Sequence, residues 1–574
     1  MKFSLNWLAQ DLETEASVGE IAETLTMIGL EVESIEDRAK GMEDFVTARV
    51  LEAGPHPNAD RLKLCRVDNG TEVLEVVCGA PNARDGLIGV FAGAGTYIPG
   101  IDATLKKSKI RGVTSNGMLL SEKEMGLSDD HEGIVELPAD TPIGVPAVEI
   151  MGLGDPLFDI AITPNRGDCL GVRGIARDLA AAGIGTLKPL DIKPVKGSFE
   201  SPIQVHLDFT PETASACPHF AGRLIRGVEN KQSPAWLREK LEAIGLRPIS
   251  ALVDITNLMT IALSRPLHVF DADKLNGHIH VRLAKPGEKL LALDGKEYEL
   301  DGEMTVIADE KHGEALGGVM GGEVTGCTDG TVNVFLESAY FDPVRTAATG
   351  RKLNLQSDAR FRFERGVDPA FSVPGMELAS KLIMDICGGE ASEPVIAGNE
   401  PDWRRSYDLR HGRVAQLGGV EVDAAETKRI LGDLGFDVED GDGAWRVGVP
   451  SWRPDVVGEA DLVEEVVRIH GYGKVPTVHL TPPTALPQPA LDTAQHRRVL
   501  ARRAMAARGL TEAVTYSFIS SDQAELFGPV PDNLRLVNPI SSELDVMRPS
   551  MLPGLIAAAA RNADKGSPDL ALFE

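Results

Sequence analysis

Two proline-rich breaks constrain this chain more than any other feature, because they divide it into separate folding units. Proline and lysine crowd the stretch from Leu187 to Gly197, and proline recurs from Thr481 to Pro489. Proline fixes φ and removes a backbone donor, so both stretches are predicted to be linkers between domains. At roughly 150 residues per domain, a chain of 574 residues is predicted to form about four units.

The charge of the chain narrows the classes of function. The 58 Lys and Arg residues stand against 86 Asp and Glu residues, which gives a net charge of −28. Such a field repels phosphate, which excludes indiscriminate polyanion binding but leaves a local nucleic-acid site open. The six cysteines form no CxxC pair and are predicted to be reduced thiols. The sequence has no signal peptide and no apolar run near the roughly 20 residues of a membrane span, so a cytoplasmic location is predicted.

A helix closed by glycine, followed by an extended segment, recurs along the chain. The first such helix is expected over residues 17–33, where Ser17 caps it with Glu20 as the capping-box partner and Gly29 ends it. The same pattern of helix, glycine and extended segment is predicted around Gly245, Gly435 and Gly509. Without a fixed period this is no solenoid, and mixed α+β domains are predicted.

Residues 45–137 change to short β-rich runs separated by turn pairs such as Asn69-Gly70 and Asp85-Gly86, which predicts a small β-barrel. Four cations gather in this otherwise acidic region: Lys106, Lys107, Lys109 and Arg111. Barrels of the oligonucleotide-binding (OB) type bind nucleic acid with basic loops, and such a patch can bind phosphate. The alternative is a loop that is merely solvated.

Two segments carry residues suited to positioning water or a polar ligand. Thr256 and His268 flank an apolar stretch, and a histidine that titrates near neutrality can orient or deprotonate water. The alternative is a histidine packed against Phe270 with its nitrogens bonded to backbone. Glu337 interrupts an apolar strand, where a buried carboxylate is costly unless it meets a donor. That donor is either a ligand hydroxyl or a structural arginine, for which Arg345, Arg351 and Arg360 are the candidates.

An acidic segment near the carboxyl side is a candidate cation site. Asp455 precedes a predicted helix on which Asp461, Glu464 and Glu465 are expected to share the face opposite the apolar one. Oxygen ligands without His or Cys favour Mg²⁺ or Ca²⁺ over zinc. The alternative is a solvated acidic face, partly neutralised by Arg468. The sequence contains no GxxxxGK[ST] phosphate-binding loop, so it predicts no nucleotide-hydrolysing site.

In chain order these motifs resemble the β subunit of bacterial phenylalanyl-tRNA synthetase from the first residue to the last. The resemblance rests on the following stretches: MKFSLNWL at 1–8, GPHPNADRL at 54–62, DITN at 254–257, PLHVFD at 266–271, GGVMGGE at 317–323, FERGVDP at 363–369, PSWRPD at 450–455 and DLVEEV at 461–466. Several long motifs in the same order make it specific.

The resemblance implies an α+β multidomain fold with five parts. Residues 1–40 and 152–195 would form one discontinuous α+β domain around an OB-type, tRNA-binding barrel at 41–151. Residues 202–400 would form an α/β editing domain and 401–478 a helix-containing domain. Residues 490–574 would begin a class II synthetase-like, non-catalytic antiparallel-sheet module, so the natural chain is expected to continue past residue 574.

The resemblance also implies partners and activity. In that family the β subunit joins a catalytic α subunit, which carries the ATP and phenylalanine site, in an (αβ)₂ heterotetramer that charges tRNA(Phe). The absent ATP signature agrees with this. The basic residues at 106–111 would meet tRNA, and the resemblance turns Asp455, Asp461, Glu464 and Glu465 from a solvated face into a predicted Mg²⁺ site.

The family's β subunit carries a second site, which hydrolyses tyrosine wrongly attached to tRNA(Phe). Carried over by motif, this editing pocket would be lined by Thr256, His268, Gly321, Glu337, Ser357 and Ala359. Glu337 would accept the tyrosine phenol proton and His268 would place the hydrolytic water, as a base or as an anchor. Two other functions remain open: a tRNA-binding and scaffolding subunit whose editing pocket has decayed, and a stand-alone tRNA-binding protein.

Overall fold

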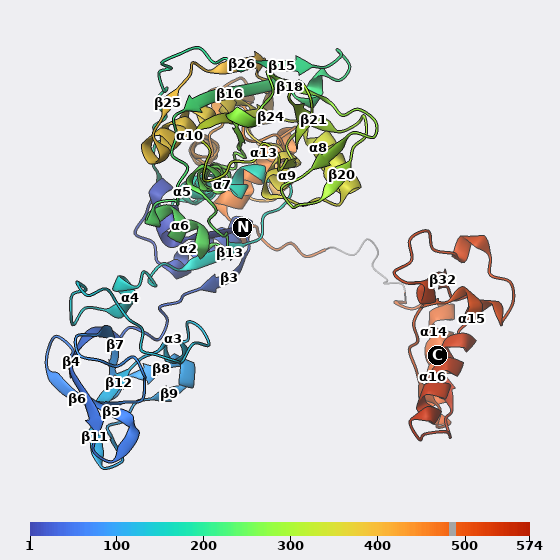
Figure 1. Cartoon of the computed structure of the whole chain (residues 1–574). Coiled ribbons are helices and arrows are strands. Elements are labelled where there is room, and N and C mark those ends of the chain that lie inside the picture. The colour runs from blue at the N-terminus through green and yellow to red at the C-terminus, as the bar shows by residue number, and fades with distance from the viewer. Residues whose placement is uncertain (481–488) are drawn as a thin grey trace. The chain divides into compact units, whose positions relative to one another are not determined.

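The computed structural model describes residues 1–480 and 489–574. These residues divide into two compact units, 1–476 and 477–574. Both combine helices with small sheets of two to five strands, so the predicted mixture of α and β structure is confirmed (Figure 1). None of the helices in the two described ranges is both long enough and apolar enough to cross a membrane.

The first predicted helix is present as α2 (Val18–Met27), with the capping box that the sequence indicates. The Ser17 backbone N–H donates to the Glu20 carboxylate at 2.8 Å, and the Glu20 N–H donates back to the Ser17 hydroxyl at 3.3 Å. Gly29 follows with φ +92°, a conformation that glycine adopts without steric cost. The helix is shorter than the predicted 17–33 because this turn lies inside that range.

Segments from both sides of residues 45–146 pair in one small sheet. β13 (Leu157–Ile160) lies between β1 (Lys2–Ser4) and β3 (Val32–Glu36) in antiparallel pairing. Likewise β14 (Thr186–Leu187) pairs with β2 (Leu12–Glu13). Residues more than 150 positions apart are therefore neighbours in space.

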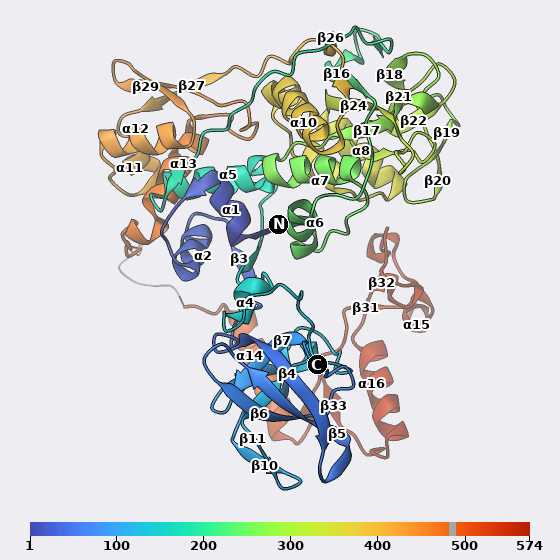
Figure 2. The ribbon, with the colours of Figure 1, turned by 60° about the vertical axis from the view of Figure 1, so that its left-hand side comes forward.

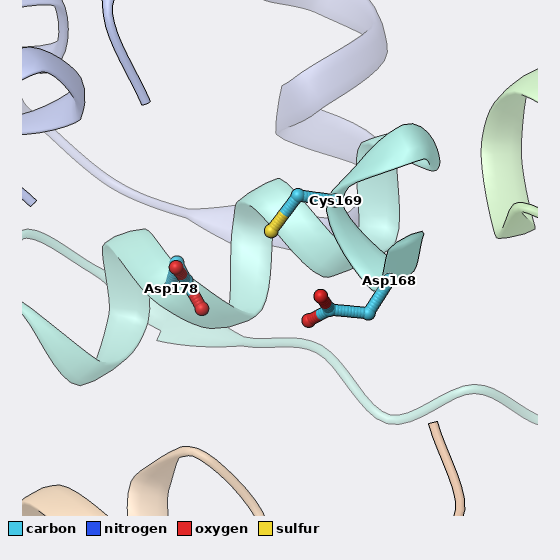
Figure 3. A group of neighbouring side chains, drawn as sticks. All are labelled: Asp168, Cys169 and Asp178. Carbon is cyan, nitrogen blue, oxygen red and sulfur yellow. The ribbon is translucent and has the colours of Figure 1, made fainter. Parts of the chain in front are cut away.

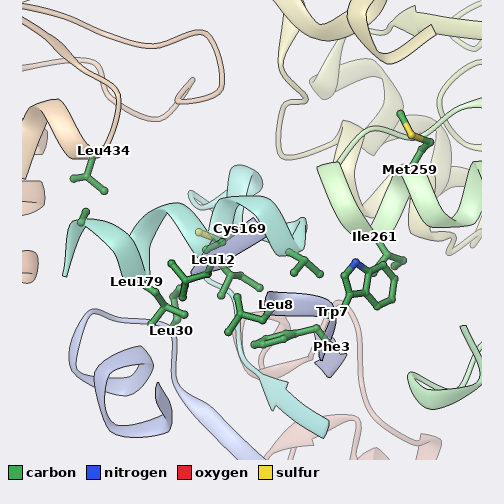
Figure 4. Close-up of a cluster of buried hydrophobic side chains, with 14 of the residues drawn as sticks. Phe3, Trp7, Leu8, Leu12, Leu30, Cys169, Leu179, Met259, Ile261 and Leu434 are labelled. Atoms are coloured by element: carbon green, nitrogen blue, oxygen red, sulfur yellow. The ribbon is translucent and has the colours of Figure 1, made fainter. Parts of the chain in front are cut away.

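One hydrophobic core runs through the larger unit. Helices α1 (Leu5–Asp11) and α5 (Val172–Ala181) contribute Trp7, Leu8 and Leu179, which are fully or almost fully buried (Figure 4). The same cluster reaches Met259, in a different helix, and Leu434. At about 25 cal/mol per Å² of apolar surface, this shared core holds distant stretches of the chain together.

The predicted closed barrel is not present among the described residues, and an open five-stranded antiparallel sheet takes its place. Its order is β12-β7-β4-β5-β6. The strands are β4 (Val46–His56), β5 (Ala59–Asp68), β6 (Val73–Cys78), β7 (Ile88–Gly93) and β12 (Gly117–Leu119). Near the two edge strands of this sheet, the Asn116 N–H donates a hydrogen bond to the Glu75 carbonyl at 3.0 Å. Because β12 has only three residues, no ladder between β12 and β6 closes the ring.

A short hairpin precedes β12. It consists of β10 (Ser108–Ile110) and β11 (Val113–Ser115), joined by Arg111 and Gly112. Both joining residues have positive φ, 48° and 92°, as a two-residue hairpin turn of type I′ requires. The small elements around it are β8 (Tyr97–Ile98), β9 (Ala103–Thr104), α3 (Glu122–Met125) and α4 (Ala147–Ile150).

Residues 205–398 form two sheets. One has the order β15-β18-β21-β22-β23: β15 (Val205–Asp208), β18 (Ile279–Leu283), β21 (Thr305–Ala308), β22 (Gly313–Leu316), β23 (Met320–Gly321). The other has the order β17-β24-β16, with two short strands on β16: β17 (His268–Asp271), β24 (Asn333–Tyr340), β16 (His219–Arg226), β25 (Glu390–Ala391), β26 (Val395–Gly398). β19 (Lys289–Leu291) and β20 (Glu297–Glu299) pair separately.

Two helices pack on the second of these sheets. α10 (Ser372–Cys387) packs on β16, β24 and α7 (Ala251–Leu263), as Figure 2 shows. The remaining helices of this stretch are α6 (Ala235–Ala243), α8 (Pro343–Leu353) and α9 (Asp358–Phe363).

Residues 406–470 form a three-stranded sheet with three helices. The strands, in sheet order, are β27 (Ser406–Arg410), β29 (Ala444–Gly448) and β28 (Asp437–Asp440). The helices are α11 (Arg413–Gly418), α12 (Ala424–Asp433) and α13 (Glu459–His470).

The smaller unit is built from short elements. They are α14 (Thr493–Ala507), β30 (Thr511–Glu512), β31 (Phe518–Ile519), α15 (Ser521–Glu525), β32 (Val546–Met547), α16 (Leu552–Asp564) and β33 (Leu572–Phe573). β30 pairs with β33 in parallel, so the final apolar run is a strand. The predicted linker from Thr481 to Pro489 lies outside the described residues, except for Pro489.

Candidate functional site

Four of the six predicted pocket residues line one cavity of about 60 Å³: His268, Gly321, Glu337 and Ala359. They come from β17, β23, β24 and α9, so the cavity lies where the two sheets and a helix meet. A volume of this size holds at least one water molecule. The tertiary structure therefore brings together residues that are up to 91 positions apart in sequence, from 268 to 359.

The ladder of the second sheet places His268 next to Glu337. The two residues are direct register partners on the antiparallel strands β17 and β24. Directly opposite residues project from the same face, with Cβ atoms about 4.5–5.5 Å apart. On its other side Glu337 is opposite Gly222, which has no side chain. The carboxyl group thus has the imidazole, and no other side chain, as its ladder neighbour.

Glu337 is buried without a bonding partner. Its carboxyl group makes no hydrogen bond or ion pair to any residue that the structure describes, and only 6% of the residue is exposed. Burial raises the pKa of Glu337 to about 8, although the charge of Arg265 opposes the rise. At neutral pH the carboxyl is therefore mostly protonated, and it can both donate and accept a hydrogen bond.

None of the three arginines considered as structural partners reaches Glu337. Arg345 donates to the Glu303 carbonyl, Arg360 pairs with Glu364, and Arg351 is exposed on α8. Arg265, which the sequence reasoning missed, lies behind the strand and donates to the Ser338 hydroxyl, the Ala339 carbonyl and the Ser372 hydroxyl. One sequence signal could have indicated Arg265: it is a basic residue directly before a proline, at the end of an apolar helix.

His268 has an edge-on contact and an unbonded nitrogen. Its ring meets the Phe270 ring at 79° with 4.5 Å between centroids, as the packing alternative supposed. Its Nε2 atom is buried, however, and has no hydrogen-bond partner among the described residues. Burial lowers the pKa of His268 to about 4, so the imidazole is neutral at pH 7. A neutral ring with a free nitrogen facing a cavity can bind and orient water.

Gly321 leaves room for that ring. A Cβ atom at this position would lie 2.3 Å from His268 Cε1 and 2.8 Å from Nε2. Atoms do not approach this closely, so any side chain at 321 would displace the imidazole. The absence of a side chain, rather than an unusual φ, is what the site requires here.

The two other predicted pocket residues do not line the cavity. Thr256 lies in α7 and donates to the Val253 carbonyl at 2.7 Å, a bond within its own helix. Ser357 is the N-cap of α9, accepts the Arg360 N–H at 3.0 Å and donates to the Val319 carbonyl. Ser357 therefore positions two neighbours of the cavity, Val319 and the start of α9, without facing it. Ile307, Ala315 and Leu316 line the cavity although they lie outside the quoted motifs.

The prediction that three carboxylates share one face of the acidic helix is wrong. In α13 the side chain of Glu465 is buried with the apolar residues, whereas Glu464 is exposed. Glu465 bonds to Arg453 and, at 2.9 and 2.6 Å, to Arg468, which hold its pKa well below the usual range. Asp455 bonds to Arg453 through both oxygens at 2.9 and 2.8 Å.

Of the four predicted metal-binding carboxylates, Asp461 and Glu464 form no ion pair with an arginine among the described residues. Asp461 accepts the Val457 N–H at 2.8 Å. The four carboxylates are not among the described groups whose ligand atoms lie within 4.8 Å of one another. Asp461 is half-buried and Glu464 is exposed. Mg²⁺ usually keeps several waters and takes one or two carboxylates, so two carboxylates are enough in number for it.

One group of potential ligands does converge, on η2 (Gly167–Leu170) and α5: Asp168, Cys169 and Asp178 (Figure 3). Arg166 already fills this position. It donates to Asp168 at 3.0 Å, to Asp178 at 2.9 Å and to the Cys169 sulfur at 2.9 Å. The group is therefore a buried ion network, which Arg468 extends through Asp178 at 2.8 Å.

The four predicted basic residues lie on and beside the β10–β11 hairpin. Lys106, Lys107, Lys109 and Arg111 are all exposed. None of them forms a salt bridge within the described residues, so their charges are available to a ligand. The turn is held by the Asn58 side chain, which donates to the Arg111 carbonyl at 3.0 Å, and by His56, bonded to the Ile110 carbonyl at 3.1 Å.

Four stretches of the chain match domain families that occur in tRNA synthetases. The matches are a putative tRNA binding domain at 45–146, a B3/4 domain at 216–388, a tRNA synthetase B5 domain at 407–472 and a phenylalanyl tRNA synthetase beta chain CLM domain at 479–574. The cavity lies within the second stretch and the basic hairpin within the first. Together they define the chain as part of an aminoacyl-tRNA synthetase.

The chain belongs to the family of phenylalanine–tRNA ligase beta subunits. It is 58% identical over 574 residues to the beta subunit of Paramagnetospirillum magneticum, covering 100% of this chain and 72% of that one. It is 57% identical over 578 residues to the beta subunit of Rhodospirillum rubrum, again with 100% and 72% coverage. The family that the motifs indicate is confirmed.

Among solved structures, the chain matches an N-terminal fragment of the phenylalanyl-tRNA synthetase beta subunit from Pyrococcus horikoshii. The match has 17% identity and a TM-score of 0.31, and covers 55% of this chain and 88% of the fragment.

Proposed function

We propose that this chain joins an α subunit in an (αβ)₂ heterotetramer that charges tRNA(Phe) with phenylalanine, using ATP. Its identity to named beta subunits along its whole length carries the proposal. The sequence holds no phosphate-binding loop of its own, which agrees with an ATP and phenylalanine site on the α subunit. Such a complex works in the cytoplasm, where tRNA and the ribosome are. A chain that never co-purifies with an α subunit and supports no charging would contradict this proposal and favour a stand-alone tRNA-binding protein.

The proposed division of labour follows the predicted domains. Residues 41–151 would act as an OB-type tRNA-binding domain inserted between 1–40 and 152–195, and the pairing of β1 with β13 supports that insertion. Residues 202–400 would form the editing domain, 401–478 a B5-like domain, and 490–574 part of a class II-like module.

We further propose that the cavity hydrolyses Tyr-tRNA(Phe). The observation that carries this is the pair formed by the buried, unbonded Glu337 carboxyl and the buried, unbonded Nε2 atom of His268, on one face beside the cavity. Glu337 would bind the tyrosine phenol, and His268 would hold the attacking water with Nε2. Water adds to the ester carbonyl, the bond to the ribose oxygen breaks, and that oxygen takes the released proton, giving tyrosine and free tRNA(Phe).

The protonation state of Glu337 sets how the pocket tells the two amino acids apart. A neutral carboxyl offers the phenol both a donor and an acceptor, whereas the phenylalanine ring leaves the buried carboxyl unbonded. Leaving a buried polar group unpaired costs about 1–3 kcal/mol. A hydrophobic site that attaches phenylalanine to tRNA discriminates against an added hydroxyl by only about 10²-fold. A second site that discriminates between the two amino acids is therefore useful.

Deacylation of Tyr-tRNA(Phe) by the assembled complex tests the editing proposal. The Glu337→Ala variant should lose most of its preference for the tyrosyl over the phenylalanyl ester, a change of about tenfold or more. Glu323→Ala, which removes an exposed carboxylate from the same stretch, is the matched control. Equal rates for wild type and Glu337→Ala would remove Glu337 from this role.

A scaffolding subunit with a decayed pocket is the second candidate. The small cavity, and the position of Thr256 and Ser357 outside it, favour this alternative. It predicts that wild type hydrolyses Tyr-tRNA(Phe) no faster than buffer while charging of tRNA(Phe) proceeds normally.

We propose a Mg²⁺ ion at Asp461 and Glu464, completed by water or by the α subunit. Titration of the assembled complex with Mg²⁺ should lose one binding event in Asp461→Asn/Glu464→Gln. Asp437→Asn/Glu439→Gln, which removes two carboxylates from exposed positions on β28, should keep it. Identical titrations would make the surface a solvated acidic face.

A further inference from the structure

A second cavity, of about 300 Å³, lies away from the editing site and shares no lining residue with it. Its walls come from stretches that are far apart in sequence, including residues 187–190 and 263–264. Three further stretches contribute to them. These are α5 with the turn before it, the segment 366–371, and Trp452. Its volume lies at the lower end of the range for small-molecule sites.

An incompletely paired arginine lines this cavity. The Arg177 guanidinium lies over the Trp452 ring, 4.2 Å from its centroid. Its one ionic partner among the described residues is Asp168, at 3.5 Å, which is longer than the about 2.7–2.9 Å of a charge-assisted hydrogen bond. Because a guanidinium carries five N–H donors, most of those on Arg177 have no partner.

The nearby carboxylates do not supply the missing charge. Asp168 is already bonded to Arg166 at 3.0 and 3.1 Å. Asp368 accepts the Ala370 N–H at 2.9 Å and is not within ion-pair distance of Arg177 among the described residues. Burial raises its pKa. The other lining cation, Arg173, is held by Asp11 at 2.7 Å and by the Lys188 carbonyl at 3.0 Å. Arg173 thus has a carboxylate at hydrogen-bonding distance, whereas Arg177 has none closer than 3.5 Å among the described residues.

The rest of the wall is mainly apolar. Leu187, Leu190, Leu263, Phe371 and Trp452 contribute to it. A few convergent polar groups in an apolar cleft are typical of a site that orients a small ligand. Guanidinium groups form bidentate hydrogen bonds with carboxylate and phosphate oxygens, so Arg177 favours an anionic ligand.

We propose that this cavity binds a small organic anion, with a carboxylate or phosphate on Arg177 and an apolar body against Leu190 and Trp452. The ligand contacts α5, Leu190 and Trp452 at once, so its binding stabilises their arrangement and raises the melting temperature with concentration. This site is independent of ester hydrolysis at Glu337.

Calorimetric titration of the full chain with benzoate, phenyl phosphate and inorganic phosphate tests the proposal. We expect an aromatic probe to bind about tenfold or more tightly than inorganic phosphate, because it also fills the apolar wall. A preference for benzoate identifies a carboxylate ligand, and a preference for phenyl phosphate identifies a phosphate monoester. No binding of either aromatic probe at about 10 mM, or inorganic phosphate binding as tightly as both, overturns the proposal.

Two variants locate the binding. Arg177→Gln removes the guanidinium, and Leu190→Trp fills the cavity while leaving Arg177 in place, so a folding defect in one does not decide the result. Each should weaken the aromatic probe about tenfold or more, with the melting temperature of the free protein confirming the fold. Arg247→Gln, at an exposed arginine outside the cavity, should bind as wild type does. Affinity unchanged in both cavity variants overturns the proposal.

Discussion

At the scale of single residues, the candidate site depends on groups whose usual partners are missing. Glu337 is buried and His268 is half-buried with its Nε2 atom buried, and loss of solvation favours the neutral form of each. Neutral groups with free hydrogen-bonding positions are costly to keep in a folded chain unless a ligand uses them. That cost is the physical reason to regard this pair as functional rather than as part of the core.

The pH dependence of stability should reveal Glu337. Its folded pKa of about 8 exceeds the ordinary 4.5, so the folded chain holds a proton that the unfolded chain has released, and stability falls as pH rises between these values. His268, with about 4 against 6.5, has the opposite effect, which ends at pH 6.5. Between pH 6.5 and 8, wild type should therefore lose up to about 1.4 kcal/mol per pH unit relative to Glu337→Gln. Melting temperatures of both proteins across this range check it, and parallel curves would contradict it.

The Gly321→Ala substitution should disable the site with little loss of fold. The new methyl group would overlap the His268 ring, which must rotate away from the cavity, at a cost of about 1–3 kcal/mol. Tyr-tRNA(Phe) deacylation should fall well below wild type while charging by the complex persists. Gly432→Ala is the control, because its Cβ meets no atom within 4 Å. Wild-type deacylation by Gly321→Ala would show that ring position is unimportant.

At the scale of elements, local patterns predicted well where local forces decide. Gly29, Gly245, Gly435 and Gly509 all close helices with positive φ, from 84° to 94°. Three of these turns lead into strands, as predicted, but the chain after Gly245 enters α7 instead. The helix ends are fixed by local backbone geometry, whereas the next element depends on what it packs against.

The β10–β11 hairpin should contribute to tRNA binding through phosphate contacts. Lys106→Ala/Lys107→Ala should reduce the slope of log affinity against log salt by roughly 1 for each lost contact. The control, Lys285→Ala/Lys296→Ala, removes the same charge from exposed positions in another part of the larger unit. Filter binding of tRNA(Phe) to the complex at several salt concentrations measures this, and equal slopes for the two double variants would exclude specific contacts by the hairpin.

At the scale of the whole molecule, a chain of net charge −28 hides a cluster of arginines in its interior. Arg166, Arg453 and Arg468 are all nearly inaccessible, and they share Asp178 and Glu465 between them. Arg468 also donates to the Ile28 carbonyl at 3.3 Å. This network connects the N-terminal stretch with α13, next to the core that both share.

Removing one member of this network should cost far more than removing a surface pair. Arg468→Ala leaves Asp178 and Glu465 with fewer partners in the interior, and breaking such a pair typically costs about 3–5 kcal/mol. Arg446→Ala breaks an exposed pair with Asp408 at 3.1 Å and should cost no more than about 1 kcal/mol. Thermal melting of both variants compares them, and similar small losses would mean that the network adds little to stability.

The sequence by itself determined the mixed α and β composition, the capped helix α2, the glycine turns, the family, and four of the residues that line one cavity. These follow from local backbone preferences or from motifs that stay together along the chain. Only the tertiary structure decided that the sheet at 46–119 stays open, that Glu337 pairs with no arginine within the described ranges, and that Asp455 and Glu465 each pair with one or more. Burial and ion pairing depend on which distant segments meet, and spacing along the chain carries no record of that.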